Sequence, residues 1–225
     1  MAERRAKGAG AHEVDDSERE PILRALDVSR ETELRLNAFR DIVLRWSSAI
    51  NLVAPGTLPQ FWTRHVLDSA QLILHAPAGA ESWLDLGSGA GFPGLVVAAL
   101  AKERAPSMTV TLMESDARKC AFLIAAAQTM EVDVVILRRR IESGPALASD
   151  IVSARALAPL PKLLELAARH VAPRGVGLFL KGAGVDDELA LAAREWRYTV
   201  TRAPSLSDDG GAILKMKEIG RVGSD

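Results

Sequence analysis

The sequence has little cysteine and few aromatic residues. It contains one Cys, one Tyr and 4% aromatic residues in all. A single cysteine excludes a disulfide framework and a zinc site built on cysteines. Cys120 lies in KCAFLIAAA, which has the pattern of a helix, so we interpret it as a small buried residue rather than a nucleophile. So few aromatic side chains argue against the stacking surfaces of single-stranded RNA modules.

Signals for a metal site, a membrane and secretion are also missing. The four histidines have no metal-ligand spacing, so we expect no metal. No apolar run is long enough to span a membrane, and the first ten residues lack the apolar core of a secretory signal. The net charge of -1 means that any nucleic-acid binding must come from a local patch. We expect a cytoplasmic protein with no membrane partner.

Three segments are expected along the 225 residues. Residues 1–20 are small and charged, which predicts a disordered tail. Residues 21–80 are predicted to form an N-terminal helical extension, because apolar residues recur at helical spacing after Ser29 and a second helical segment, FWTRHVLDSAQLILHA, follows a Pro-Gly turn. Residues 81–220 are expected to form the main domain.

In the main domain, short apolar strands alternate with helices. SWLDL is followed by PGLVVAALAKE, TVTLMES by RKCAFLIAAAQTM, and then come VVILRRR, DIVSAR with PKLLELAARHV, and GVGLFLK. This alternation predicts an α/β fold with parallel strands and right-handed crossovers. RYTVTR and AILKMKEI flank the Gly-rich SLSDDGG, which predicts a terminal antiparallel hairpin.

The stretch DLGSGAGFPG, residues 85–94, lies between a predicted strand and a predicted helix. Its glycines permit a tight turn and the close approach of a ligand to the backbone. Glu114 follows at the end of the next strand, where a carboxylate accepts hydrogen bonds from ribose hydroxyls. Together these features predict a nucleoside ligand at the carboxyl edge of the sheet.

Two cofactors compete for this loop. The pattern Asp85-x-Gly87-x-Gly89-x-Gly91 resembles motif I of the Rossmann-like S-adenosylmethionine-dependent methyltransferases. A nicotinamide dehydrogenase would carry a second wound half or a catalytic Tyr-Lys pair, and the only tyrosine, Tyr198, lies in the predicted hairpin. We favour the methyltransferase over the dehydrogenase, and both over glycines that only permit packing.

Several motifs in order make the resemblance specific. INLVAP, RHVLDSAQL, DLGSGAGFPG, ESDARKCAFL, RRRIE, SARALAPL and FLKG span roughly residues 46–182. Together they resemble the GidB (RsmG) family, which methylates N7 of a guanine in 16S ribosomal RNA. The resemblance implies a Rossmann-like class I methyltransferase fold, with a mostly parallel seven-stranded sheet, and S-adenosylmethionine as the cofactor. It also implies a partner, which is 16S ribosomal RNA or the small ribosomal subunit.

The resemblance also assigns residues. Cofactor contacts are expected from Gly87, Gly89, Gly91, Phe92, Glu114, Ile141, Glu142 and Arg155. Catalytic residues at the mouth of the site are expected to be Arg64, His65, Arg155 and Lys181. Independently of the resemblance, the positive charge of the run Arg138-Arg139-Arg140 predicts that Arg138 and Arg139 bind RNA phosphates, with a solvated strand end as the alternative.

Two of these residues have plainer interpretations. Arg64 and Asp68 are four positions apart, so an ordinary surface ion pair on a helix is the alternative for them. For Arg155 the alternative is an ion pair with Glu142 or Glu114. Its candidate ligands are the carboxylate of the cofactor, an RNA phosphate and O6 of the target guanine.

The chemistry implied by the resemblance needs no general base. N7 of guanine carries an in-plane lone pair, so catalysis would consist mainly of aligning N7, the methyl group and sulfur. Two other functions stay open, a small-molecule methyltransferase and a nucleotide-binding regulatory module without turnover. Methyl transfer to ribosomal RNA would separate all three.

Overall fold

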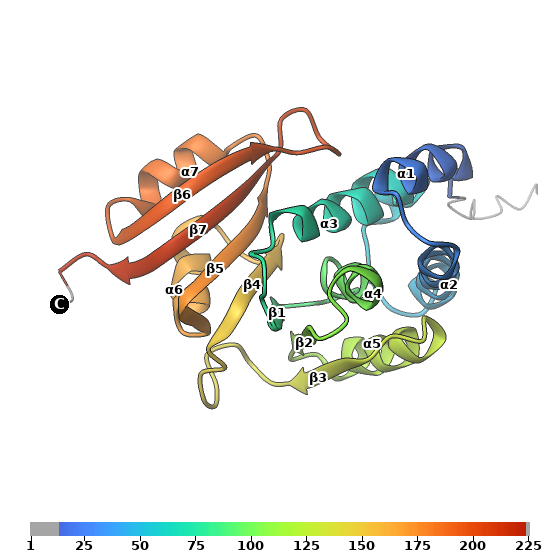
Figure 1. Ribbon diagram of the computed structural model, residues 1–225, viewed down its shortest axis with the longest axis horizontal. Coiled ribbons are helices and arrows are strands. Elements are labelled where there is room, and N and C mark those ends of the chain that lie inside the picture. Colours follow the sequence, from blue (N-terminus) through green and yellow to red (C-terminus); the bar gives the residue numbers. More distant parts are fainter. Residues whose placement is uncertain (1–13, 224–225) are drawn as a thin grey trace, which may run out of the picture.

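The computed structural model of the protein describes residues 14–223 and shows a sheet with helices on both faces (Figure 1). The seven strands lie in the order β3-β2-β1-β4-β5-β7-β6. They are β1 (Ser82–Leu86), β2 (Thr109–Glu114), β3 (Val134–Arg138), β4 (Ser149–Arg155), β5 (Val171–Lys181), β6 (Trp196–Pro204) and β7 (Ala212–Arg221). β1 to β5 pair in parallel, and β7 lies antiparallel between β5 and β6. The predicted sheet and its terminal hairpin are confirmed.

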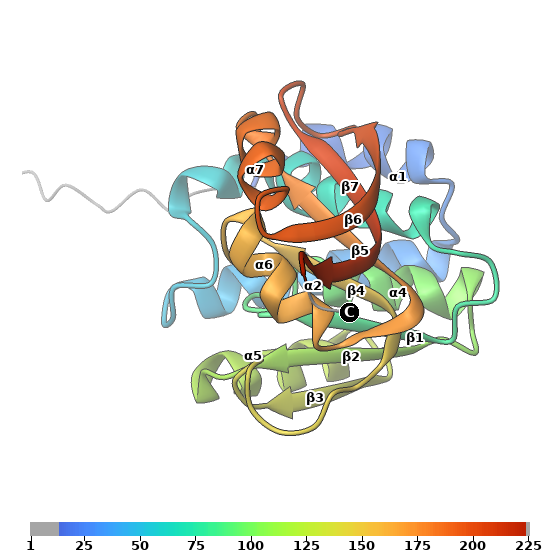
Figure 2. The ribbon, with the colours of Figure 1, turned by 90° about the vertical axis from the view of Figure 1, so that its left-hand side faces the viewer.

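The helices form two layers. They are α1 (Arg19–Leu26), α2 (Arg30–Ser47), α3 (Asp68–Ala70), α4 (Gly94–Arg104), α5 (Ala117–Thr129), α6 (Leu160–Ala168) and α7 (Val185–Ala192). α4, α5 and the N-terminal helices cover one face of the sheet, and α6 and α7 cover the other (Figure 2). Every residue from Gly94 to Ala101 of α4 is buried, because α4 lies between the sheet and the N-terminal helices.

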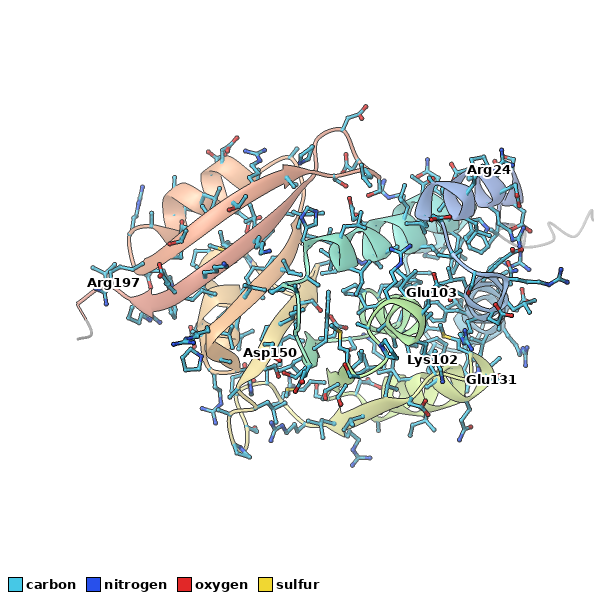
Figure 3. The ribbon with its side chains drawn as sticks, in the orientation of Figure 1. Arg24, Lys102, Glu103, Glu131, Asp150 and Arg197 are labelled. Atoms are coloured by element: carbon cyan, nitrogen blue, oxygen red, sulfur yellow. The ribbon has the colours of Figure 1, made fainter. Side chains whose placement is uncertain are left out.

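The N-terminal helices pack onto the main domain. Glu103 of α4 accepts hydrogen bonds from the N–H of Ser29 (3.1 Å) and the hydroxyl of Thr32 (2.8 Å), which fastens α4 to the start of α2 (Figure 3). Trp46 near the end of α2 contacts Phe122 of α5 edge to face, with ring centroids 5.7 Å apart. The extension therefore shares the core of the sheet domain.

The disordered tail was predicted to end at residue 20, and that boundary is too late. Asp16–Glu18 form a 3-10 turn and α1 begins at Arg19. Asp16 accepts hydrogen bonds from Nε1 of Trp62 (2.8 Å) and from Arg40 (2.7 Å). These two partners order a charged segment that has no apolar pattern of its own. Residues 1–13 lie outside the described residues.

The second predicted helical segment is part of a run of consecutive helical turns over residues 55–75, which we call the helical rod. The type of helix changes along it. A 3-10 helix (Pro55–Gln60) precedes a π-helical turn (Trp62–Leu67), then α3, then a second 3-10 helix (Gln71–His75). α3 and the second 3-10 helix pack along α4 (Figure 1). The π-helical turn lies beside Arg155, the last residue of β4. π-helical turns are rare and recur at functional sites. This turn carries Arg64 and His65.

The order in which strands are added to the sheet reverses between β1 and β4. β2 and β3 are added on one side of β1, and the chain then returns to place β4 on the other side. At the amino ends of the two strands, Asp150 accepts hydrogen bonds from the N–H groups of Glu81 and Ser82, each 3.0 Å long (Figure 3). Ligands of open α/β sheets bind at the opposite, carboxyl ends of such a pair.

Candidate active site

The glycine loop and Arg155 come from the two strands that meet at this switch point. The loop follows β1, and Arg155 is the last residue of β4. Gly87, Gly89 and Gly91 all have left-handed backbone angles, with φ of 64°, 53° and 84°. Residues with side chains rarely adopt these angles, which is the local reason for the glycines.

The loop glycines serve different purposes. A Cβ on Gly89 would have only the carbonyl oxygen of Gly87 near it, 3.6 Å away. A Cβ on Gly91 would lie 2.5 Å from Leu95, and one on Gly94 would collide with a side chain of β2. Gly89 is therefore open to a ligand, whereas Gly91 and Gly94 let the loop and α4 pack tightly on the core.

Glu114 is joined directly to the loop. One of its oxygens, Oε2, accepts a hydrogen bond from the N–H of Gly89 (3.0 Å). The other, Oε1, accepts from the N–H groups of Ser115 (2.7 Å) and Asp116 (2.8 Å). Because a carboxylate oxygen accepts about two hydrogen bonds, Oε2 keeps capacity for one further donor.

Asp85 forms the buried floor beneath the loop. The hydroxyl of Ser153 in β4 donates to Oδ1 of Asp85 (2.7 Å) and accepts from Nε1 of Trp83 (2.8 Å). Burial raises the pKa of Asp85 to about 6, although the hydrogen bond from Ser153 opposes this rise. These contacts fix β1 to β4 at the switch point.

Arg155 reaches across to the helical rod. Nη1 donates to the carbonyl oxygen of Arg64 (2.8 Å) and lies 3.3 Å from Oδ2 of Asp68. Nη2 lies 3.0 Å from Nδ1 of His65, and Cζ lies 4.9 Å from the ring centroid of Phe92. The side chain of Arg155 is only 17% exposed. Four neighbours therefore hold its guanidinium.

These contacts decide against both of the plainer alternatives. Asp68 pairs with Arg155, so the alternative of a surface ion pair between Arg64 and Asp68 is wrong. The partner of Arg155 is likewise Asp68, not Glu142 or Glu114. The physical reason is the π-helical turn, whose wider winding removes Arg64 from the position one α-helical turn before Asp68.

His65 is buried between aromatic rings and cations. Its ring is stacked on Phe92, with centroids 4.9 Å apart, and lies 5.9 Å from the ring of Phe61. Burial, with the positive charges of Arg155 and Arg64, lowers the pKa of His65 to about 3. The imidazole is therefore neutral at physiological pH.

A cleft of about 770 Å³ opens beside this cluster. All four residues expected to be catalytic line it, namely Arg64, His65, Arg155 and Lys181. Lys181, at the end of β5, donates to the carbonyl oxygen of Ala158 (3.0 Å) and to Glu188 (2.6 Å). Of the three cations among them, Arg64, Arg155 and Lys181, only Arg64 is exposed.

The other expected residues, the glycine loop with Phe92 and Glu114 included, are not among those that line the cleft. Ile141 is buried, and its carbonyl oxygen lies 2.8 Å from Nε2 of His170, whereas Glu142 is exposed. Arg138 is exposed at the end of β3. Arg139 instead donates to the carbonyl oxygen of Pro145 (2.9 Å). The structure thus gives Arg138 and Arg139 different surroundings, although they are adjacent.

Sequence reasoning predicted the Gly-rich loop between β6 and β7 but missed its contact with the helical segment that carries Asp68 and Gln71. Gln71, fully buried, donates to the hydroxyl of Ser205 (3.1 Å) and accepts from the N–H of Leu206 (2.7 Å). Oδ1 of Asp68 accepts from the hydroxyl of Ser207 (2.7 Å). Asp68 thus joins Arg155 to this loop. The only sequence signal is that Asp68 and Gln71 both fall in RHVLDSAQL.

Within residues 14–223, no group of three or more His, Cys, Asp or Glu side chains is placed to hold a metal ion. No helix in this part of the chain is both long and apolar enough to cross a bilayer. Cys120 is buried in α5, as expected, and burial raises the pKa of its thiol.

Solved structures with a similar architecture show the class of fold. An S-adenosylmethionine-dependent methyltransferase from Aquifex aeolicus aligns with a TM-score of 0.53 at 15% identity, over 70% of this chain and 93% of that one. A TehB-like S-adenosylmethionine-dependent methyltransferase from Corynebacterium glutamicum aligns with a TM-score of 0.51 at 20% identity, over 80% and 97%. The fold is that of the Rossmann-like methyltransferases.

Sequence comparison identifies the family within that class. The GidB family, described as rRNA small subunit methyltransferase G, matches residues 32–210. Ribosomal RNA small subunit methyltransferase G of Paramagnetospirillum magneticum is 49% identical over 90% of this chain and 96% of its own. The protein of that name from Cereibacter sphaeroides strain ATCC 17029 is 47% identical over 90% and 98%. The chain belongs to the GidB family.

Proposed function

We propose that the protein transfers a methyl group from S-adenosylmethionine to N7 of a guanine in 16S ribosomal RNA. The observation that carries the proposal is the cleft at the switch point, which the cations Arg64, Arg155 and Lys181 line together. Leu157, also in the lining, lies against Gly87 of the glycine loop. Family membership supports ribosomal RNA as the substrate.

The loop suits the proposed cofactor. The space above Gly89 would admit the amino-acid part of S-adenosylmethionine, and the remaining acceptor capacity of Glu114 suits a ribose hydroxyl. When bound, the cofactor supplies an electrophilic methyl group on a sulfonium. Because N7 of guanine carries an in-plane lone pair, its attack on that methyl group would need no proton transfer, and the residues of the cleft would only have to hold and orient the base.

The side chains of the cleft suit a reaction without a general base. His65 is neutral and hydrogen-bonded through both ring nitrogens. Cys120 is buried in α5 and is absent from the residues that line the cleft. Arg155 and Lys181 are each paired with a carboxylate, so the exposed Arg64 is the cation best able to attract a phosphate. The cleft also offers positioned donors, which orient a base. Arg155 is the residue best placed to orient a base.

The test is methyl transfer from labelled S-adenosylmethionine to small-subunit RNA and to intact small subunits, followed by nucleoside analysis. We expect label in 7-methylguanosine, with large-subunit RNA and free guanosine as unlabelled controls. Label in another nucleoside would overturn N7 as the target. Transfer only to small molecules would favour the small-molecule enzyme, and cofactor binding without turnover would favour the regulatory module.

A further inference from the structure

His65 has a defined hydrogen-bonding role that its position in the cleft does not by itself explain. Its Nδ1 lies 3.0 Å from Nη2 of Arg155, and its Nε2 lies 2.9 Å from the hydroxyl of Thr57. A guanidinium can only donate hydrogen bonds, so Nδ1 of His65 must accept. The proton of the neutral ring is therefore on Nε2.

The other end of the chain of hydrogen bonds independently requires the same tautomer. The hydroxyl of Thr57 donates its one proton to the carbonyl oxygen of Ala54 (2.8 Å). Its oxygen must then accept from Nε2 of His65. The hydrogen bonds thus run in one direction from Arg155 through His65 and Thr57 to the backbone. Protonated His65 would place an N–H against Arg155, which has no acceptor.

The guanidinium of Arg155 retains two donors. Of its five N–H groups, the two on Nη1 are used by the carbonyl oxygen of Arg64 and by Asp68, and one on Nη2 is used by His65. The N–H of Nε and the second N–H of Nη2 have no partner within residues 14–223. The ring of Phe92 lies against the guanidinium plane. Orientation of Arg155 therefore decides where the two remaining donors point.

We propose that His65 is a positioning residue, which accepts one N–H of Arg155 as a neutral, Thr57-held imidazole and so fixes the other two N–H groups for the RNA substrate in the cleft. The proposal rests on the proposed function for the identity of the substrate. It assigns His65 no proton transfer, because both ring nitrogens are engaged. It also makes Thr57, which lines the same cleft, part of the support of Arg155.

The kinetic test compares two substitutions at position 65. His65→Leu removes the acceptor, whereas His65→Asn keeps an oxygen at about the reach of Nδ1. We expect His65→Leu to lower kcat at least about tenfold and His65→Asn to lower it less than about threefold, with S-adenosylmethionine affinity unchanged in both. His75→Leu, on the same helical rod but outside the cleft, is the matched control. Equal losses in the Leu and Asn variants would overturn the proposal.

A double-mutant cycle assigns the effect to Arg155. In an Arg155→Ala background the further change His65→Leu is expected to lower kcat by less than about twofold, because the group that His65 positions is gone. If the full tenfold loss persisted in that background, His65 would act by some other route. Circular dichroism and melting curves identify variants that have lost their fold.

Nitrogen NMR of the imidazole tests the arrangement without using activity. His65→Asn assigns the resonances, and we expect one neutral tautomer with the proton on Nε2 that does not titrate between about pH 5.5 and 8. The charged groups that face the ring are the cations Arg155 and Arg64, with Asp68 beyond the guanidinium. Phe61 and Phe92 pack on it without charge.

A proton on Nδ1, or titration near the ordinary pKa of histidine, would overturn the proposal. Arg155→Ala should move the Nδ1 resonance, and an unmoved resonance would contradict the hydrogen bond. These outcomes are independent of the proposed function, which fails instead if the wild-type protein transfers no methyl group to ribosomal RNA.

Discussion

Oδ2 of Asp68 lies 3.3 Å from Nη1 of Arg155, although 87 positions separate the two residues. Both side chains are less than a fifth exposed, at 18% and 17%. Asp68 of the helical rod supplies the negative charge that balances the guanidinium of Arg155 at the end of β4. The other oxygen of the same carboxylate holds Ser207, so one side chain links three segments of the chain.

Asp68→Asn keeps the shape of this link and removes its charge. We expect a loss of about 1.5–3 kcal/mol in the free energy of unfolding, because hydrogen bonds to charged groups contribute about that much. Methyl transfer should also fall, since Arg155 loses its counter-ion. The control is Glu165→Gln in the exposed pair with Lys162, which should change stability by less than about 1 kcal/mol. Equal effects of the two substitutions would mean that the buried pair has no special role.

Arg155→Lys retains the charge and loses the planar fork. A lysine ammonium cannot reach Arg64, His65 and Asp68 in the same geometry, so we expect methyl transfer to fall at least about tenfold, or about 1.4 kcal/mol. Separate measurements of S-adenosylmethionine and RNA affinity would show which ligand Arg155 serves. Wild-type transfer rates in a folded variant would exclude Arg155 from the active site.

Gly89→Val and Gly94→Ala should separate cofactor binding from folding. Gly89→Val places a branched side chain in open space at positive φ, at a cost of about 1–2 kcal/mol in backbone strain, and should abolish S-adenosylmethionine binding while the fold survives. Gly94→Ala places a methyl group 2.9 Å from Oδ2 of Asp85 and against Leu112, so it should cost about 1–3 kcal/mol of stability.

Calorimetry measures the affinity of the two glycine variants and thermal melting measures their stability. Unchanged cofactor affinity in a folded Gly89→Val variant would remove the loop from the site. A fully stable Gly94→Ala variant would contradict the packing contact that we describe between the start of α4 and β2.

Arg138 and Arg139 should differ in their effects on RNA binding. Arg138→Ser removes an exposed charge and is expected to reduce the slope of log affinity against log salt by about 0.7–0.9. Arg139→Ser is expected to act on the segment around Pro145 instead, since its guanidinium donates to that carbonyl oxygen. Arg174→Ser, an exposed residue near the start of β5 and so at the opposite edge of the parallel strands, is the control.

Filter binding over a range of salt concentrations measures these slopes, and cofactor affinity should be unchanged in the Arg138 variant. The double variant of Arg138 and Arg139 should show the slope of Arg138→Ser alone. A slope equal to that of the wild type would assign the arginines to ordinary solvated surface.

The stability of the protein should depend on the protonation of His65. Its pKa is about 3 in the folded state against an ordinary value of 6.5, so the unfolded chain binds a proton between these limits and the folded chain does not. Stability therefore rises with pH through this window, by at most about 1.4 kcal/mol per pH unit for one group. The wild type should lose more stability than His65→Asn when the pH falls from about 6.5 to 5.

The difference between wild type and variant is the quantity to measure, because Asp85 acts in the opposite sense. Its pKa is raised to about 6 in the folded state, so its contribution is lost as pH rises through that value. Asp85 is present in both proteins, so its contribution to the pH dependence of stability cancels in the difference between them. Parallel curves of stability against pH would contradict a buried neutral His65.

Much of the fold could be predicted because its signals are local. The glycines of the loop lie where left-handed backbone angles occur, and Glu114 ends the strand beside it, where its carboxylate meets the N–H of Gly89. Alternation of apolar strands and helices indicated a parallel sheet, and one Gly-rich turn indicated the hairpin. The extent of the tail was predicted wrongly, because Asp16 is ordered by Arg40 and Trp62, which lie far along the chain.

The sequence by itself therefore determined the strand-loop-helix unit, the helical character of residues 61–76 and the chemical groups available to the site. Only the tertiary structure decided which of these groups meet. The spacing of Arg64 and Asp68 is compatible with an ion pair on a helix. In the structure Asp68 pairs with Arg155 instead, because the turn before Asp68 is π-helical and because β4 lies beside β1. Contacts of this kind depend on the order of strands in the sheet and on the winding of one turn, and neither is encoded in the spacing of the residues that meet.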